Sequence, residues 1–292
     1  MAIVTTDNQH YTDIAAAIRS KNGTETQYKP SEMAAAIQAI SGGGGEPEPP
    51  DDGKTRLYIT VPANAMPDRP PPRNQVPLYI QQTVANGVTI DWGDGTEPET
   101  LPGNKNLRID NGIGPVNTIH TYKNAGDYII TLDPKDECKL GFGDFVYSRG
   151  IIDNHHIMGG IYAPNVYLKK ICIGRNVNDI SRSAFTNAIL LTSVTIPDGV
   201  SKISEQAFSS CLCVMTIVVS RSVSTIGNRA FFGCYAKEYH FFSEIPPILE
   251  NTNVFQDIPS DCIIYVPKGS AEAYKTATNW TTYAQYIQEE PA

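Results

Sequence analysis

The sequence lacks the features that would place it among membrane, secreted or nucleic-acid-binding proteins. No apolar run reaches the roughly 18 residues that a membrane helix needs, so we expect no membrane insertion. The first residues, MAIVTTDNQHYTD, have neither the basic nor the apolar region of a secretory signal. Basic residues are few: 23 Lys and Arg stand against 31 Asp and Glu, and the formal net charge is -8. Because phosphate binding requires clustered Lys and Arg, we expect no nucleic-acid partner.

Catalytic motifs are also missing. The sequence has no GxSxG, HExxH, GxxxxGK[ST] or CxxC pattern, and no GxGxxG follows a predicted strand. Its Asp and Glu residues leave room for a glycosidase carboxylate pair, but nothing in the sequence brings two of them into one cleft. The adjacent His155 and His156 have no Cys or His partner at ligand spacing. We therefore predict a protein that is not an enzyme, with no cofactor and no metal site.

What the sequence does contain is a 23-residue repeat near its C-terminus. The blocks 168–190, 191–213 and 214–236 align without a gap. Apolar residues recur at fixed offsets, as in Ile171/Val194/Ile217, Ile173/Ile196/Val219, Ile180/Ile203/Ile226 and Phe185/Phe208/Phe231. One block cannot bury its own apolar side, so neighbouring blocks must stack into a solenoid with a shared core. Such a stack offers a surface for recognition rather than built-in chemistry.

The six cysteines fit this repeat better than they fit a disulfide framework. Cys211 and Cys234 occupy one repeat position, where the first block has Ala188. A position that accepts both Ala and Cys is typical of small buried side chains. We interpret the cysteines as buried free thiols.

The repeat blocks, with their AFxxC and VTIPDGV elements, resemble the BspA-like leucine-rich repeats of bacterial surface antigens. Residues 237–259 are interpreted as a degenerate fourth repeat in which Val254 and Phe255 are displaced by one position. The tail, with CIIYVPKGS at 262–270 followed by Trp280, resembles the strand and helix that end such arrays. The resemblance implies adhesion or ligand recognition. We expect residues 134–167 to cap the first repeat, within a repeat domain that spans 136–292.

Residues 54–135 predict a separate β domain. The segments VTIDWGDGT at 88–96, IHTY at 119–122 and AGDYII at 125–130 resemble a polycystic-kidney-disease (PKD) type immunoglobulin-like sandwich. Asp91 and Asp94 lack the further oxygen ligands of a calcium site, so we interpret them as turn-stabilising carboxylates. Trp92 is expected in the sandwich core. The resemblance implies that His120 and Tyr122 pack or hydrogen-bond within this fold.

Residues 1–40 predict a short helical module, and the Gly/Pro-rich segment 41–53 predicts a linker. The Ala-rich sequence DIAAAI at 13–18 is echoed as EMAAAI at 32–37. A two-helix unit of this size is too small to be stable alone, so we expect it to self-associate or to dock on another protein. Its predicted anchoring and oligomerisation residues are Tyr11, Ile14, Ile18, Met33, Ile37 and Ile40.

The segments YTDIAAAIRSKNG and KPSEMAAAIQAI are similar to leaders on tail and minor structural proteins of phages of Gram-positive gut bacteria. This resemblance implies a virion structural protein, of the tail-fibre, baseplate or capsid-attached type, displayed on the virion and extracellular after host lysis. Its implied partners are other virion proteins through the N-terminal module, further copies of itself (a trimer is favoured), and a glycan or protein on the host surface. The alternatives are a BspA-like bacterial adhesin and a carbohydrate-active enzyme.

Taken together, these features predict a mainly β, multidomain chain. We expect its ligand to bind to an aromatic patch near the end of the repeats. Because strand residues alternate, we expect Lys170, Ser193, Thr216 and Tyr239 to face outward, with Cys172, Thr195, Val218 and Phe241 beside them. The predicted ligand-binding residues are Tyr235, Tyr239, His240, Phe241 and Phe242. One alternative stays open: the segment around Tyr274 and Trp280, or a neighbouring subunit, covers these aromatic side chains.

Overall fold

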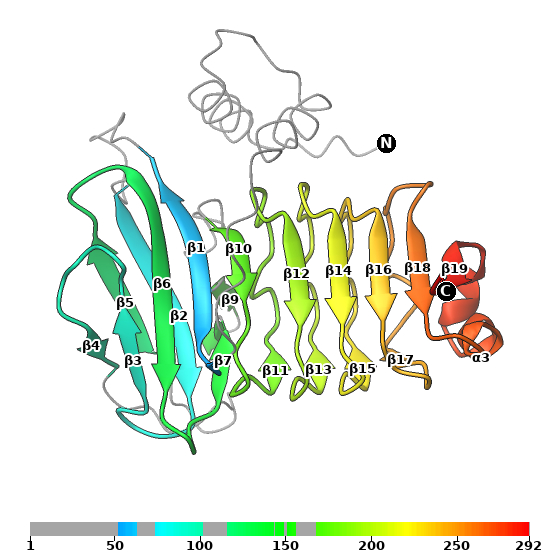
Figure 1. The fold of residues 1–292 in the computed structure, drawn as a ribbon, viewed down its shortest axis with the longest axis horizontal. Helices are drawn as coiled ribbons and strands as arrows, with labels where there is room; N and C mark the ends of the chain where they lie inside the picture. Colours follow the sequence, from blue (N-terminus) through cyan, green and yellow to red (C-terminus); the bar gives the residue numbers. More distant parts are fainter. Residues whose placement is uncertain are drawn as a thin grey trace, which may run out of the picture. The chain divides into compact units, whose positions relative to one another are not determined.

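The computed structural model describes residues 52–62, 74–101, 116–142, 144–148, 151–155 and 168–291, and these ranges are built mainly of β-strands (Figure 1). The chain divides into Met1–Pro49 and Pro50–Ala292, and every described residue belongs to the second unit. The predicted helical module and its residues Tyr11, Ile14, Ile18, Met33, Ile37 and Ile40 therefore lie outside the described residues.

The N-terminal part of the second unit consists of two antiparallel sheets. One contains β1 (Thr55–Val61), β6 (Gly126–Pro134), β3 (Val88–Asp91) and β4 (Glu99–Thr100), and the other contains β5 (Val116–Thr121), β2 (Gln75–Gln82) and β7 (Leu140–Phe142). The strands coincide with the apolar, β-branched segments of the sequence. Trp92 is buried, as predicted, and its carbonyl oxygen accepts a hydrogen bond from the Tyr122 hydroxyl at 2.9 Å. The described residues of 54–135 therefore form β structure, and their buried side chains belong to one hydrophobic core that continues into the repeats.

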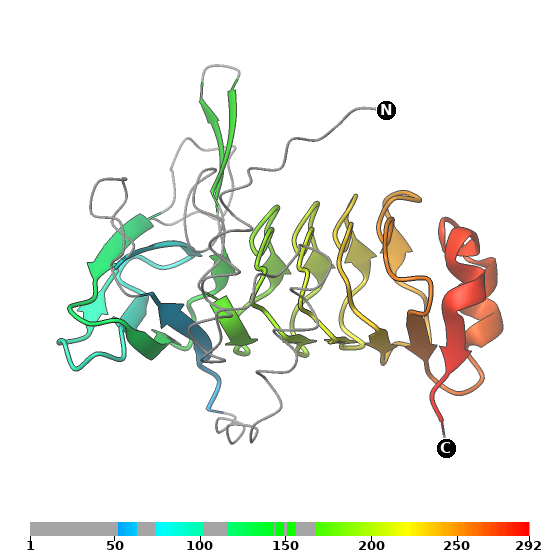
Figure 2. The same ribbon diagram turned by 90° about the horizontal axis from the view of Figure 1, so that it is seen from above.

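The repeats form a parallel ladder of strands beside this part. The strands are β10 (Leu168–Cys172), β12 (Ser193–Ile196), β14 (Thr216–Val219), β16 (Glu238–Phe241) and β18 (Ile263–Val266). Opposite them run the short strands β11 (Asp179–Ile180), β13 (Lys202–Ile203), β15 (Thr225–Ile226) and β17 (Ile248–Leu249) (Figures 1 and 2). Between the two sheets lies a row of buried aromatic rings at centroid spacings of 5.0 to 5.7 Å, formed by Phe142, Phe185, Phe208, Phe231 and Phe255. The recurring Phe therefore fills the solenoid interior, as the repeat predicts.

Strand β1 joins the two parts into one sheet. Its residue Leu57 pairs with Ile130 of β6 on one side and with Ile171 of β10 on the other, both antiparallel. The result is a ten-stranded sheet that runs from β4 to the C-terminal strand β19 (Ile287–Glu289). At the junction the backbones come so close that a Cβ on Gly174 would lie 2.3 Å from the Gly53 carbonyl oxygen. The open edge of the first repeat is thus covered by a strand of the preceding β part.

The predicted cap segment 134–167 contributes only in part among its described residues. Leu140 of β7 forms an isolated bridge with Val177, and the Phe142 ring lies 5.7 Å from the Phe185 ring. Strands β8 (Asp144–Ser148) and β9 (Ile151–His155) form a two-stranded antiparallel sheet, with no further strand of the described ranges beside it. The cap of the first repeat therefore combines β1, which pairs with β10, and β7, whose Leu140 bridges Val177, and these two strands are far apart in sequence.

The other end of the array is closed by α3 (Ala271–Thr276) and the 3-10 helix η2 (Trp280–Tyr286). Within the array, the carbonyl oxygens of Ile203 and Ile226 accept hydrogen bonds from the backbone N–H groups of the next repeat, at 2.7 and 3.0 Å. In the last repeat the equivalent Leu249 carbonyl accepts the Asn279 side-chain amide instead, at 2.7 Å. Side chains of the cap thus replace the main chain of a missing repeat.

Two further cap side chains act in the same way. The Trp280 indole N–H donates to the Pro247 carbonyl at 2.8 Å, and the Phe255 N–H donates to the Tyr283 hydroxyl oxygen at 3.1 Å. An exposed row of unpaired backbone groups would invite pairing with another chain. The cap satisfies these groups at the last repeat, so the solenoid ends at this point.

Candidate functional site

The candidate site is the outer face of the repeat strands, that is, the side of β10, β12, β14, β16 and β18 that points away from the solenoid core. Side chains alternate along each strand, and strand pairing places equivalent residues side by side. Two outward rows result. One contains Lys170, Ser193, Thr216, Glu238 and Ile263, and the other contains Cys172, Thr195, Val218, His240 and Tyr265.

The outer face changes in character along the array. In its centre the side chains are small, and Ser193 and Thr195 are exposed. Towards the C-terminal end they become larger and more polar, with Glu238, His240 and Tyr265. A flat centre bordered by a polar aromatic end can accept an extended ligand and hold it by van der Waals contact and hydrogen bonds.

His240 is the centre of the polar end. Its Nδ1 lies 2.6 Å from a carboxylate oxygen of Glu290, and its Nε2 lies 3.3 Å from a carboxylate oxygen of Glu238. The imidazole ring stacks on Tyr265 at a centroid distance of 4.9 Å. The contact with Glu290 ties the C-terminal segment across β18 to β16.

The predicted aromatic patch is not one surface. Tyr239 and Phe241 are 0% and 1% exposed, so the prediction that they face outward and contact a ligand is wrong. Phe241 packs on Tyr274 and Trp280, at centroid distances of 6.0 and 5.4 Å, which is the covering that the alternative interpretation described.

The error has a simple cause in the strand register. Tyr239 pairs with Ile217, which lies 22 residues earlier rather than 23, so one residue is missing before β16. A shift of one residue moves every side chain of a strand to the opposite face. Glu238 is therefore the outward neighbour of Thr216. The alternation of Tyr239 with Phe241, which matches that of Ile264 with Val266, is the sequence signal that marks these two aromatic residues as core.

The other three residues of the predicted patch remain accessible but are separated. Tyr235 and Phe242 are 52% and 55% exposed and lie before and after β16, on opposite ends of the strand. His240 is partly buried on the outer face between them. Sequence reasoning missed the residues that accompany His240, namely Tyr265 and Glu290, because they come from the tail rather than from the repeats.

Five of the six cysteine thiols belong to the core, and Cys172 lies on the outer face of β10. All six are free, and five of them are buried. Burial raises the pKa of Cys213 and of Cys262 to about 12 and that of Cys234 to about 11. The nucleophilic thiolate is therefore scarce at neutral pH. The interpretation as buried free thiols is confirmed for these five cysteines, whereas Cys172 is only partly buried.

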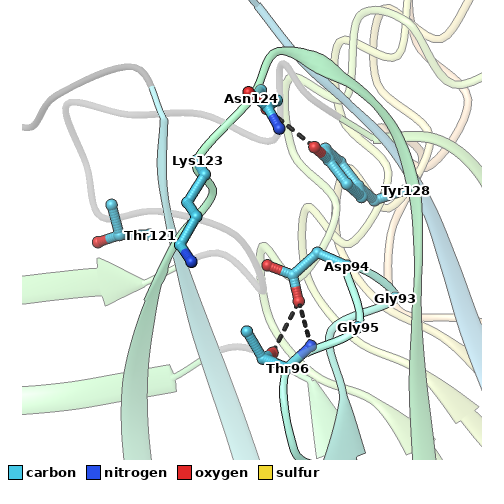
Figure 3. Close-up of a pocket in the computed structure, with 8 residues that line it drawn as sticks. All are labelled: Gly93, Asp94, Gly95, Thr96, Thr121, Lys123, Asn124 and Tyr128. Atoms are coloured by element: carbon cyan, nitrogen blue, oxygen red, sulfur yellow. Dashed lines mark hydrogen bonds between the residues drawn. The ribbon is translucent and has the colours of Figure 1, made fainter.

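Asp91 and Asp94 hold the turn after β3, as the sequence predicts. Asp91 accepts a hydrogen bond from the Gly93 N–H at 2.9 Å, and Asp94 accepts from the Thr96 N–H and hydroxyl at 3.1 and 2.7 Å (Figure 3). His120 Nε2 lies 2.7 Å from the second Asp94 oxygen, and its ring stacks on Trp92. Burial alone would raise the pKa of Asp94, but the hydrogen bonds from Thr96 and His120 outweigh it and lower that pKa to about 2.

The described residues contain no group of three or more His, Cys, Asp or Glu side chains placed to hold a metal ion. No helix within the described ranges is long and apolar enough to cross a membrane.

Comparison with protein families bears on the repeat part. Residues 156–260 match the BspA type leucine rich repeat region, in six copies. The repeats are therefore of the BspA leucine-rich type. Comparison with the curated proteins gives no match.

Proposed function

We propose that the chain is an adhesin-like surface protein whose repeat array recognises a glycan or protein on a cell surface. The observation that carries the proposal is the continuous outer face, which the BspA-type repeats present on a closed array. The outer face is one extended surface that lies between β1 at one end of the array and Asn279 with its neighbours at the other. We expect recognition without turnover of the ligand.

The proposal is tested by enlarging small side chains on this face. Thr195→Arg and Thr216→Arg place bulky charged groups in its flat centre, and we expect each to reduce adsorption of the labelled protein to target cells by at least about tenfold, or about 1.4 kcal/mol. The matched control is Thr225→Arg on β15, in the opposite sheet. All three variants should melt like the unmodified protein. Wild-type adsorption by both outer-face variants would overturn the assignment.

A second proposal concerns where the protein acts. The similarity of residues 1–40 to phage structural leaders favours display on a virion, with the N-terminal module bound to other virion proteins. In this proposal the chain assembles as a homo-oligomer, with a trimer favoured. A chain that starts at Asp52 should fold but fail to enter particles, because the second unit begins at Pro50. Antibody labelling of virions tests the location. Labelling of the bacterial surface without labelling of particles would instead favour a cellular adhesin.

A third candidate function is that of a carbohydrate-active enzyme. A test for turnover of a glycan substrate distinguishes it from the adhesin-like protein and from the virion protein. Incubation with a panel of cell-wall glycans should release no product. If product appears and one carboxylate substitution abolishes it, the assignment as a recognition protein is wrong.

A further inference from the structure

A hollow of about 460 Å³ lies in the β part that precedes the repeats, remote in sequence from the outer face described above. It is lined by the turn after β3 and by residues of β5, of β6 and of the connection between them (Figure 3). Its lining combines a carboxylate, two hydroxyls, an ammonium group, an amide and an aromatic ring, from Asp94, Thr96, Thr121, Lys123, Asn124 and Tyr128. Volumes of roughly 300–1,000 Å³ are typical of small-molecule sites.

One wall of the hollow is rigid because the turn is fixed from both sides. Gly93 has a φ of +75°. A Cβ at this position would lie 2.4 Å from the Ile129 carbonyl oxygen, so the backbone of the turn packs closely against β6. His120 and Thr96 hold the Asp94 carboxylate in place. At Gly95 an added Cβ would meet nothing within 4 Å, so this side of the turn is open.

The opposite wall is also fixed in advance. The Tyr128 hydroxyl donates to the Asn124 carbonyl oxygen at 2.9 Å, and the Tyr128 ring lies 4.2 Å from the buried Tyr122 ring. This bond orders the connection that carries Lys123 and Asn124, whose side chains are exposed. A ligand would therefore meet an ordered site and avoid much of the entropic cost of arranging it.

The charges and polar groups indicate the ligand class. The Asp94 carboxylate already lies 2.7 Å from His120 Nε2, whereas Lys123 makes no ion pair within the part of the chain that the structure describes. The Asn124 amide and the Thr121 hydroxyl can each donate and accept hydrogen bonds, as vicinal hydroxyls require, and the Thr96 hydroxyl, which donates to Asp94, can still accept one. The partly exposed Tyr128 ring offers an apolar face. We propose that this hollow binds one saccharide unit that carries a carboxylate, of the hexuronic acid type, with Lys123 pairing with the carboxylate.

The uronic acid unit can belong to a free sugar acid or to the end of a longer glycan. The following experiment distinguishes these two ligands. The full chain is titrated with glucuronate, with glucose, with acetate and with an oligosaccharide that ends in glucuronate, and binding is followed by calorimetry and by amide chemical shifts. We expect both glucuronate ligands to bind and to shift the amides of residues 93–96 and 121–128. Tighter binding of the oligosaccharide identifies a glycan end as the preferred source, and equal binding identifies the free sugar acid.

The variants decide whether the contacts are those proposed. Lys123→Met should weaken glucuronate binding at least tenfold, and Asn124→Ala should weaken both glucuronate ligands. Lys135→Met, an exposed lysine outside the hollow, should bind normally. Equal binding of glucose and glucuronate, competition by acetate at equal concentration, or an unaffected Lys123→Met would each overturn the proposal. None of these outcomes depends on the outer face of the repeats, so the two proposals fail separately.

Discussion

The side-chain amide of Asn279 donates to the Leu249 carbonyl oxygen at 2.7 Å, in the position that a backbone N–H of the next repeat would take. Asn279 has a φ of 67°, in the left-handed region that Asn tolerates better than most residues. Its backbone conformation and its amide together make it suited to ending the array. The relationship predicts that the stability of the repeats depends on residues outside them.

Asn279→Ala should lower the free energy of unfolding by about 1 to 2 kcal/mol, because it leaves a partly buried carbonyl without its donor. Urea denaturation followed by circular dichroism measures the change. Gln288→Ala, an exposed amide in the neighbouring β19, is the matched control and should be close to neutral. Equal effects of the two substitutions would contradict a capping role for Asn279.

Phe208→Ala should destabilise the array by roughly 3 to 5 kcal/mol, the usual cost of removing a core aromatic ring. Phe208 is fully buried and stacks on Phe185 at 5.0 Å and on Phe231 at 5.7 Å. Phe232→Ala is the control, since that partly exposed ring contacts Arg229 at the surface, and it should cost less than about 1.5 kcal/mol. A normal melting temperature for Phe208→Ala would rule out the aromatic core.

The aromatic residues around β16 should separate into two classes. Tyr239→Ala combined with Phe241→Ala should abolish cooperative unfolding, because both side chains lie in the core. Tyr235→Ala combined with Phe242→Ala should leave the melting temperature nearly unchanged, because both side chains are more than half exposed. Thermal melts of the two double variants test the register directly. If the first pair melts normally, the assigned register of β16 is wrong.

Because of Asp94, the free energy of unfolding of the β part should decrease as the pH falls below about 4. The pKa of Asp94 is about 2 in the folded protein against 3.8 ordinarily, so the unfolded chain takes up the proton first as the pH falls. The stabilisation is fully present above about pH 4 and is lost towards pH 2. Between these limits the stability difference between the wild type and Asp94→Asn should shrink by about 1 to 2 kcal/mol.

Denaturation curves at several pH values between 5 and 2 provide the measurement for Asp94. Asp198→Asn is the control, because that exposed carboxylate lies 3.9 Å from Arg221 rather than in a buried network. A difference between the wild type and Asp94→Asn that stays constant with pH would show that His120 and Thr96 do not hold the carboxylate.

The sequence alone determined the repeated elements. The 23-residue period gave the parallel strands and the buried positions of Phe185, Phe208 and Phe231, because a stacked repeat must bury the same offsets in each copy. The turn chemistry of Asp91 and Asp94 was also readable, since a carboxylate that binds a backbone N–H two residues later is a local interaction. These features can be predicted because each depends only on residues that are close in sequence or that occupy the same position in the next repeat.

Only the tertiary structure decided what happens where the period breaks. The pairing of β1 with β10 joins residues more than one hundred positions apart, and no local pattern specifies it. The missing residue before β16 placed Tyr239 in the core rather than on the surface, because a strand has two faces and one position separates them. Asn279 and Trp280 complete the last repeat with side chains where the periodic pattern has only backbone, and this substitution becomes visible only when the chain is folded.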